Sequence, residues 1–371
     1  MLKNKDRITS LQMFVIIVST INAIEVLKLP RDLSLDVGPD GWLVLIGGHL
    51  ISAVGVFFII KLGLLYPDET FADYTPKILG RFLGNPVVMI AVFFWISLTA
   101  RIVREFADFI QLILPQTPIE AIILSMLLVA AYTTRHGIEP IARTMDILFP
   151  IFIGLLALLV FSVLIDVDFS NLLPLFHSDP KALALSSVET SVGLEGQEIS
   201  LMLLPFMAMP QKAYKAVYGA LACNLALRII LFVVTIGIFG AELVKTLVWP
   251  VEELSRSIAF SGGGFGRLDS LFTALWVTVA FTSLIVFLYC ASLAFSRVMK
   301  FREQSLTVLP FLPVIFILSL VPESIVATET ISDYLSWGWG VFTFTVPPLL
   351  LLISYLRGTH RNKGQERLRE R

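Results

Sequence analysis

Residues 191–200 read SVGLEGQEIS, and they lie between the apolar stretches ALALS and LMLLPFMAM. Two glycines and two glutamates, Glu195 and Glu198, therefore stand where a membrane span should be uniformly apolar. Ionisable side chains at membrane depth are costly, and unwound backbone is tolerated there only where it is buried in protein or lines a cavity. The stretch predicts a broken membrane helix whose glutamates face a cavity. The alternative is close helix packing at Gly193 and Gly196, with both glutamates protonated or bonded to neighbours.

The composition supports a membrane setting for this stretch. The chain has 371 residues, of which 56% are hydrophobic and 15% charged, whereas a soluble domain carries about 25% charged residues. A helix needs about 20 apolar residues to cross the hydrocarbon core. The sequence predicts an all-α integral membrane protein with ten spans, at about 10–31, 42–65, 84–114, 118–135, 138–165, 182–208, 212–240, 267–297, 306–322 and 331–356.

The lysines and arginines orient these spans. With a cytoplasmic N-terminus, 19 of the 28 fall in inner segments, six in outer segments and three inside spans. Because cytoplasmic loops are enriched in Lys and Arg, both termini are expected to face the cytoplasm, with a basic tail at 357–371.

Several function classes are not expected. The net charge of -1 and the lack of a basic groove argue against nucleic acid as a partner. The two cysteines lie inside apolar spans and the four histidines are scattered, so we expect no metal site. No nucleophile–base arrangement or cofactor loop is visible, so neither an enzyme nor a cofactor is expected.

The first span carries a second polar interruption, in STINAIEV at residues 19–26. Spans one and six are the first helices of two halves of five spans each, at about 8–166 and 180–357, within a single transmembrane domain over 1–371. Interruptions at matching places in two halves point to an inverted-repeat transporter fold, with a ligand at the midplane between two broken helices. The candidate ligand-binding residues are Asn22, Ala23, Ile24, Glu25, Gly193, Leu194, Glu195, Gly196 and Glu198.

Span three carries a charged stripe. Arg101, Arg104, Glu105 and Asp108 fall at i, i+3, i+4 and i+7, on one helix face. Arg101 can pair with Glu105, and Arg104 with Asp108, at i,i+4 spacing. The stripe is a candidate polar pathway or gate, or a latch onto another span. A purely structural ion-pair network fits it equally well.

Two isolated charges complete the candidate pathway or gating residues. Asp146 lies in span five and can simply snorkel or pair with a neighbour. Arg228 lies deeper, in LALRIILFVV, and needs a counter-charge, for which Glu25, Glu195 and Glu198 are candidates.

From about residue 8 to residue 356 the chain resembles the spore germination permeases, the B subunits of the GerA-type germinant receptors. The resemblance rests on several modest motifs in order: ITSLQMF (8–14), DETFADYTPKILGRFLG (68–84), REFADFIQLILPQTP (104–118), HGIEPIARTMDILFPIF (136–152), FSNLLPLF (169–176), GAELVKTLVWPVEELSRSI (240–258) and RLDSLFTALWV (267–277). That family is related to the amino acid–polyamine–organocation transporters, so the resemblance implies a LeuT-like 5+5 inverted repeat with helices 1 and 6 broken.

The resemblance implies a role in sensing. A chain of this family binds a small germinant, often an amino acid, in the spore inner membrane and works beside an A subunit and a C subunit. Here Ala23, Ile24 and Glu25 stand where relatives tend to carry Gly-x-Gly, and the break of span six holds two acids. We therefore expect a cationic, polyhydroxyl or zwitterionic ligand whose amine points toward Glu195 or Glu198.

Two other functions remain open at this stage. One is a proton-coupled transporter for amino acids or related solutes, in which Glu25, Glu195 and Glu198 alternate between protonated and ionised forms. The other is a water or ion conduit lined by the stripe in span three. The sensor requires its partner subunits, the transporter acts alone, and the conduit passes solutes without specificity.

Overall fold

The structure is a computed structural model of the chain, and it describes residues 7–22, 24–260 and 268–358. For residues 24–25, 258–260 and 268–271 only the backbone is described. Within these ranges the regular elements are helices, apart from one isolated bridge between Ile8 and Met207. Six helical stretches in the described residues are long and apolar enough to cross a membrane. The prediction of an all-α membrane protein is confirmed.

The ten predicted spans are present as helical segments. The first half comprises α1 (Ser10–Ile21) continued by α2 (Leu29–Val37), then α3 (Gly41–Leu65), α5 (Arg81–Ile113), α6 (Ile119–Arg135) and α7 (Ile138–Val163). The second half comprises α8 (Pro180–Gly193) continued by α9 (Ser200–Leu203), then α10 (Ala213–Phe239), α13 (Leu268–Val298), α14 (Ser305–Leu320) and α15 (Ile325–Arg357).

Short elements connect these segments. The remaining α-helices are α4 (Phe71–Leu79), α11 (Ala241–Val244) and α12 (Pro250–Phe260). The 3-10 turns are η1 (Ile24–Leu27), η2 (Gly38–Asp40), η3 (Leu164–Asp166), η4 (Phe169–Leu172), η5 (Gln197–Ile199), η6 (Leu204–Phe206) and η7 (Pro210–Lys212).

Two predicted span ends were wrong. Span one was expected to end at residue 31, but α2 continues to Val37 and ends at Gly38, whose φ of +58° suits glycine. Span ten was expected to begin at residue 331, but α15 begins at Ile325 because the side chain of Ser324 accepts a hydrogen bond from the backbone N–H of Ala327. Both helices therefore extend beyond their apolar cores into segments that carry charged residues.

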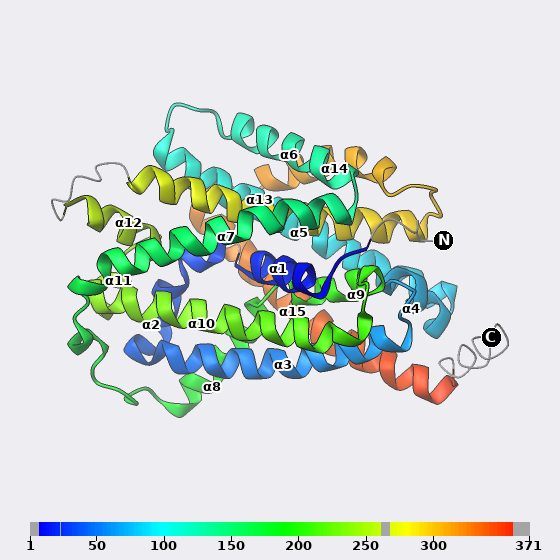
Figure 1. Cartoon of the computed structure of the whole chain (residues 1–371), viewed down its shortest axis with the longest axis horizontal. Helices are drawn as coiled ribbons and strands as arrows, with labels where there is room; N and C mark the ends of the chain where they lie inside the picture. The colour runs from blue at the N-terminus through cyan, green and yellow to red at the C-terminus, as the bar shows by residue number, and fades with distance from the viewer. Residues whose placement is uncertain (1–6, 23, 261–267, 359–371) are drawn as a thin grey trace.

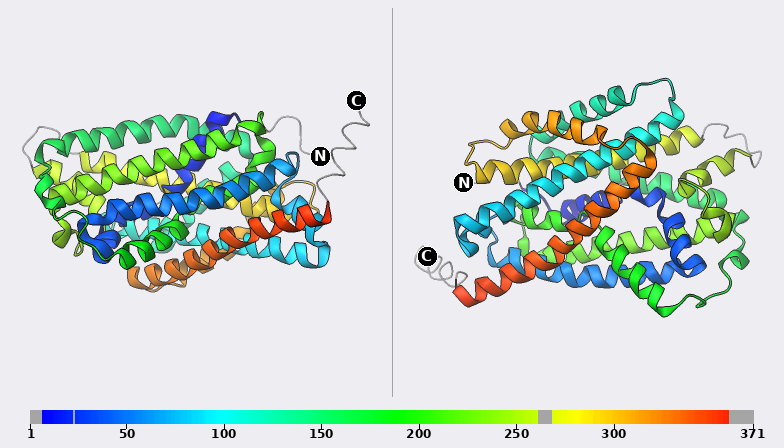
Figure 2. Two further views of the ribbon diagram at one scale, coloured as in Figure 1. Left: turned by 90° about the horizontal axis from the view of Figure 1, so that it is seen from below. Right: turned by 180° about the vertical axis from the view of Figure 1, so that it is seen from behind.

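The two halves pack as an inverted repeat. α3 packs against α8 and α10 against α1, which is the same pair of positions with the halves exchanged. The contacts of α14 with α5 and of α6 with α13 are related in the same way. Figure 1 shows α1 at the centre of the bundle, beside α10 and α7, and Figure 2 shows α15 crossing the back of the bundle obliquely. The first part of helix one, α1, thus lies at the centre of the bundle, whereas α8, the first part of helix six, lies at its edge.

Candidate functional site

Helix six breaks where the sequence predicts. α8 ends at Gly193, the chain then turns through Leu194, Glu195 and Gly196, and η5 follows. Gly196 has φ +113°, and a Cβ atom there would lie 3.0 Å from Thr20 Cγ2 and 3.1 Å from the backbone nitrogen of Ile21. Only glycine fits this position without strain, because the backbone is left-handed and lies directly against the end of α1.

Helix one breaks at the same level. α1 ends at Ile21, and both the backbone N–H and the side-chain amide of Asn22 donate to the carbonyl of Val18, at 3.3 Å and 2.9 Å. Ala23 lies outside the described residues, and only the backbone is described for Ile24 and Glu25, which form the start of η1. The polar interruption of span one is therefore a genuine interruption of the helix.

Arg228 stabilises this helix end. Its guanidinium donates a hydrogen bond of 3.0 Å to the backbone carbonyl of Ile21. The last carbonyls of a helix lack intrahelical partners and carry its partial negative charge, so a cation there is favourable. The expected counter-charge of Arg228 is thus provided in part by the backbone of α1.

Glu195 lies at the junction of three helices. Its carboxylate forms an ion pair with Arg101 of α5 and accepts a 2.7 Å hydrogen bond from the hydroxyl of Ser336 on α15. Arg101 also donates to the same hydroxyl at 3.2 Å. The side chains of Arg101 and Glu195 are only 3% and 4% exposed, so the pair is buried. The break of helix six is therefore fastened to α5 and α15.

The pairing within the charged stripe on α5 agrees with the prediction in one pair and differs in the other. Arg104 and Asp108 pair at 2.9 Å, as their spacing predicts. The expected pair of Arg101 and Glu105 was wrong: Arg101 pairs with Glu195, and Glu105 accepts a hydrogen bond from Ser332 of α15 at 3.2 Å. Folding brings Glu195 of helix six against Arg101, and this ion pair forms instead of a pair with Glu105, one turn away on α5.

The stripe also contacts α14 and α15. Arg104 donates to the carbonyl of Ser319, and Asp108 accepts from Thr328, each at 3.3 Å. Arg101 and Arg104 border a cavity of about 180 Å³ between α5, α14 and α15 whose other walls are mainly apolar. The stripe side chains are thus engaged in contacts between helices.

Glu198 is enclosed by aromatic rings. One carboxylate oxygen accepts a 2.7 Å hydrogen bond from the backbone N–H of Gly196. The indoles of Trp95 and Trp339 lie against the carboxylate and interact with it, although neither ring nitrogen reaches it with full hydrogen-bond geometry. These two rings meet edge to face at 5.7 Å. Glu198 is 1% exposed, so in this conformation it faces protein.

Asp146 is not brought together with the other candidates. It lies exposed on α7 and accepts a 2.8 Å hydrogen bond from the side chain of Gln12, near the start of α1. This contact is at the opposite end of α1 from the break.

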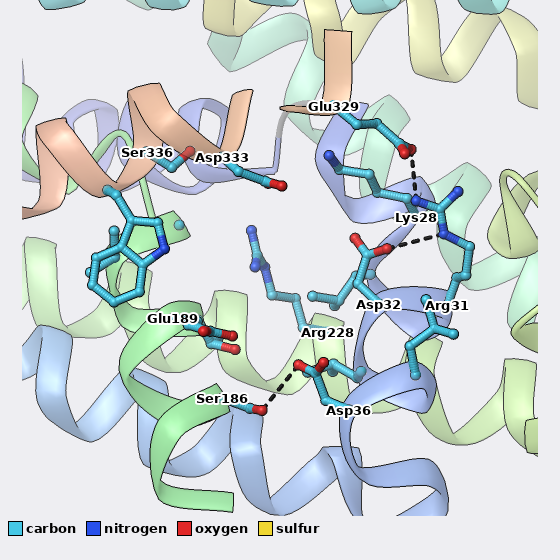
Figure 3. A pocket seen from close by; sticks show the side chains of 17 residues that line it. Lys28, Arg31, Asp32, Asp36, Ser186, Glu189, Arg228, Glu329, Asp333 and Ser336 are labelled. Atoms are coloured by element: carbon cyan, nitrogen blue, oxygen red, sulfur yellow. Dashed lines mark hydrogen bonds and ion pairs between the residues drawn. The ribbon is translucent and has the colours of Figure 1, made fainter. Parts of the chain in front are cut away.

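A pocket of about 390 Å³ that is lined by many charged side chains lies beside the two helix breaks (Figure 3). It is called the charged pocket below. Its walls come from α2, α8, α10 and α15, and it reaches Gly193 at the end of α8 and Arg228 on α10. Leu194, Glu195 and Glu198 are buried and do not line it. Its polar lining residues are Lys28, Arg31, Asp32, Asp36, Ser186, Glu189, Thr190, Arg228, Glu329, Asp333 and Ser336.

Sequence reasoning missed most of these residues, although a signal for them existed. Asp32 and Asp36 lie four residues apart on α2 and so share a helix face. Because span one was expected to end at residue 31, both aspartates fell outside the predicted helix, which hid that pattern. Among the described residues, no group of three or more His, Cys, Asp or Glu side chains is placed to hold a metal ion.

Two helices broken at the same depth within an inverted repeat define a membrane protein of the LeuT-like transporter fold. The solved structure of Mhp1, a nucleobase-cation-symport-1 family transporter in a closed conformation with bromovinylhydantoin bound, superposes with a TM-score of 0.67. The match covers 91% of this chain and 78% of that one, at 13% sequence identity. It supports the fold.

The sequence comparisons give the family. Residues 7–327 match the family described as spore germination protein. Spore germination protein YndE of Bacillus subtilis (strain 168) is 31% identical over 360 residues, covering 95% of this chain and 97% of the relative. Spore germination protein GerLB of Bacillus cereus is 28% identical, covering 94% of each. The chain belongs to the spore germination protein family and is a multi-pass membrane protein, as its resemblance implied.

Proposed function

We propose that this chain is the germinant-binding membrane subunit of a spore germinant receptor. It binds a small germinant between the broken helices, in the charged pocket, and passes the signal to A and C partner subunits. The observation that carries the proposal is that one pocket is walled by the second part of helix one, α2, and the first part of helix six, α8. In this fold a ligand is held between those two helices.

The proposed signal runs through Ser336. Its side chain lines the charged pocket and also donates to Glu195, which is paired with Arg101 on α5. A ligand that displaces α15 or the end of α8 therefore acts on α5, and through the stripe on α14. The energy for such a shift comes from the difference in ligand affinity between the two arrangements.

The pocket is proposed to face away from the cytoplasm. It is lined by residues 329–337 near the start of α15, whereas Arg357 at the other end of α15 lies beside α4 and donates to the carbonyl of Ile78. The α4 end carries the lysines and arginines that mark the cytoplasmic side. The proposed location is the spore inner membrane, with both termini in the cytoplasm and the pocket open to germinant arriving from outside.

A solute transporter is the second candidate, because the fold is that of a transporter. A conduit along the α5 stripe has less support, since the side chains of the stripe bond to α14 and α15 and the adjoining cavity is mainly apolar.

The test uses spores that lack their own germinant receptors. This chain is expressed with its partner subunits, and germination is followed as the loss of optical density with a panel of amino acids, sugars and nucleosides. We expect a response that needs the partners, and a reduced sensitivity in Ser336→Ala. Thr330→Ala, an exposed hydroxyl on the same helix, is the matched control and should behave as wild type. Solute uptake by the chain alone in liposomes, with no partner-dependent germination, would favour the transporter.

A further inference from the structure

The charged pocket has an excess of negative charge. Its lining includes five acidic residues (Asp32, Asp36, Glu189, Glu329 and Asp333) and three basic residues (Lys28, Arg31 and Arg228). Five negative and three positive charges leave a formal charge of -2. Because the walls of a pocket have a low dielectric constant, such an imbalance is felt more strongly there than on an open surface.

Part of this charge is already matched within the protein. Arg31 of α2 bonds to Glu329 of α15 at 2.6 Å and to its neighbour Asp32 at 3.1 Å. These contacts close one side of the pocket and join α2 to α15. Lys28 also acts on Asp32, so two basic residues match Asp32 and Glu329. The excess acid lies on the other side, which α8 helps to form and where Asp36, Glu189 and Asp333 are accompanied by Arg228 alone.

Three carboxylates from three helices line that side of the pocket. Asp36 comes from α2, Glu189 from α8 and Asp333 from α15, and Glu189 experiences the charges of the other two. Figure 3 shows Asp36 on α2 and Glu189 on α8 on neighbouring walls of the pocket, with the hydroxyl of Ser186 turned toward Asp36. The hydroxyl of Ser186 donates to Asp36 at 3.0 Å. Like charges held close together cost energy that a bound cation would relieve.

Arg228 adds a second, independent feature of the pocket. It is 2% exposed, and Figure 3 shows its guanidinium reaching from α10 into the middle of the pocket, whose lining also includes Asp32, Glu189 and Asp333. A carboxylate approaching Arg228 must therefore pass these acids. The arrangement disfavours a free carboxylate group on the ligand and leaves the space beside Asp36 and Glu189 for a positive group.

We propose that the charged pocket selects an organic cation, a small amine with a net positive charge, whose ammonium group lies between Asp36 and Glu189 beside the hydroxyl of Ser186. The inference rests on the proposed function and specifies its ligand. The volume of about 390 Å³ suits a solute of the size of an amino acid derivative. Bridging Asp36 to Glu189 draws α2 toward α8, so the two broken helices close on the ligand.

This placement differs from the expectation drawn from the sequence, in which the amine of the ligand points toward Glu195 or Glu198. Glu195 is neutralised by Arg101, and Glu198 is buried against Trp95 and Trp339. Neither carboxylate lines the pocket.

The test is binding to the full-length chain in nanodiscs, with probes of one size and different charge. At pH 6.5 L-alaninamide is cationic, L-alanine is zwitterionic and propionate is anionic, and 1,4-diaminobutane is a second cation. We expect alaninamide to bind at least about tenfold more tightly than alanine, and propionate not to bind, because each tenfold step corresponds to one well-placed charge contact. Raising the ionic strength from about 0.02 M to about 0.3 M should weaken alaninamide binding severalfold.

Variants locate the contact. Glu189→Gln and Asp36→Asn should each weaken alaninamide binding by about three- to tenfold while leaving the weak binding of alanine nearly unchanged. Glu242→Gln is the matched control, because Glu242 is a carboxylate on α11 that is 89% exposed and does not line the pocket.

Two outcomes overturn the inference. If alanine binds as tightly as alaninamide and is indifferent to both variants, the pocket does not select cations, although germinant binding itself stands. If neither cation binds the wild type at about 10 mM, the cation site is absent. The partner-dependent germination assay then decides the proposed function separately. The salt dependence of the wild type needs no variant, so the inference stays open to refutation even if a variant fails to fold.

Discussion

Replacing Arg101 tests whether a buried charge pair fastens the break of helix six. Arg101→Met removes the cation but keeps most of the side-chain volume. Since both side chains are less than 5% exposed, the change leaves Glu195 as an uncompensated buried charge, which costs about 3–5 kcal/mol. Ser336 still donates to one carboxylate oxygen, so we expect a loss of about 3 kcal/mol, at the lower end of that range.

A double-mutant cycle completes this test: Glu195→Gln is made alone and in combination with Arg101→Met. An amide carries no charge, and it can still accept from Ser336 and needs no cation. We expect the double variant to recover about 2 kcal/mol of the loss, because the desolvated charge is gone. The assay is thermal unfolding of the purified chain in nanodiscs, with wild type, both single variants and the double variant measured together.

The matched control is the exposed pair of Arg143 and Glu139 on α7. Its arginine side chain is 71% exposed, so Arg143→Met should cost no more than about 1 kcal/mol. If Arg101→Met proves as mild as Arg143→Met, or if the double variant is less stable than either single one, a buried charge pair does not hold this junction.

Three further predictions concern the helix ends and the far end of α1. Gly196→Ala should destabilise the chain by about 2–4 kcal/mol in thermal unfolding, since a left-handed backbone and contacts near 3 Å act together. Gly358→Ala, with a positive φ and open space around it, should lose about 1 kcal/mol. Asp40→Ala should cost about 2–4 kcal/mol, because this buried carboxylate accepts three backbone hydrogen bonds of 2.7–2.9 Å from residues 176–178; Asp40→Asn should lose less, and equal losses in the two variants would contradict this account. Asp146→Asn should leave the germinant response within about twofold of wild type, because a twofold change corresponds to less than 0.5 kcal/mol and Asp146 lies far from the breaks; a large loss of response in spores would contradict its exclusion from the site.

The breaks were predictable from sequence because their cause is local. Gly193, Gly196 and two glutamates within six residues of an apolar run cannot form a lipid-facing helix. The structure adds only that Gly196 must be glycine because the end of α1 lies against it. The ten spans were predictable for the same reason, since each is a property of about 20 consecutive residues.

The pairing of Arg101 was not predictable, because its partner is 94 residues away. From sequence the visible partner is Glu105, one turn along the same helix. An arginine at membrane depth pairs with the carboxylate that best compensates its buried charge. Glu195 is such a carboxylate, and its position is already fixed by the hydrogen bond from Ser336. The acids of the charged pocket escaped notice for a related reason. Asp36, Glu189 and Asp333 lie on three different helices, and only the fold brings them to one cavity.

The side chains packed at the break of helix six bear on whether the chain senses its ligand or transports it. Trp339 follows Ser336, which lines the charged pocket, by about one turn of α15. Trp95, Glu198 and Trp339 are each no more than 1% exposed, and the two indole rings meet between α5 and α15. A transporter must part these rings to let a solute through, and must carry the charge of that solute past a buried carboxylate. A sensor needs only a shift of α15 and α8 large enough to disturb the contacts of Ser336, Glu195 and Arg101. The pocket and this junction share Ser336, so binding can reach α5 while the rings stay closed.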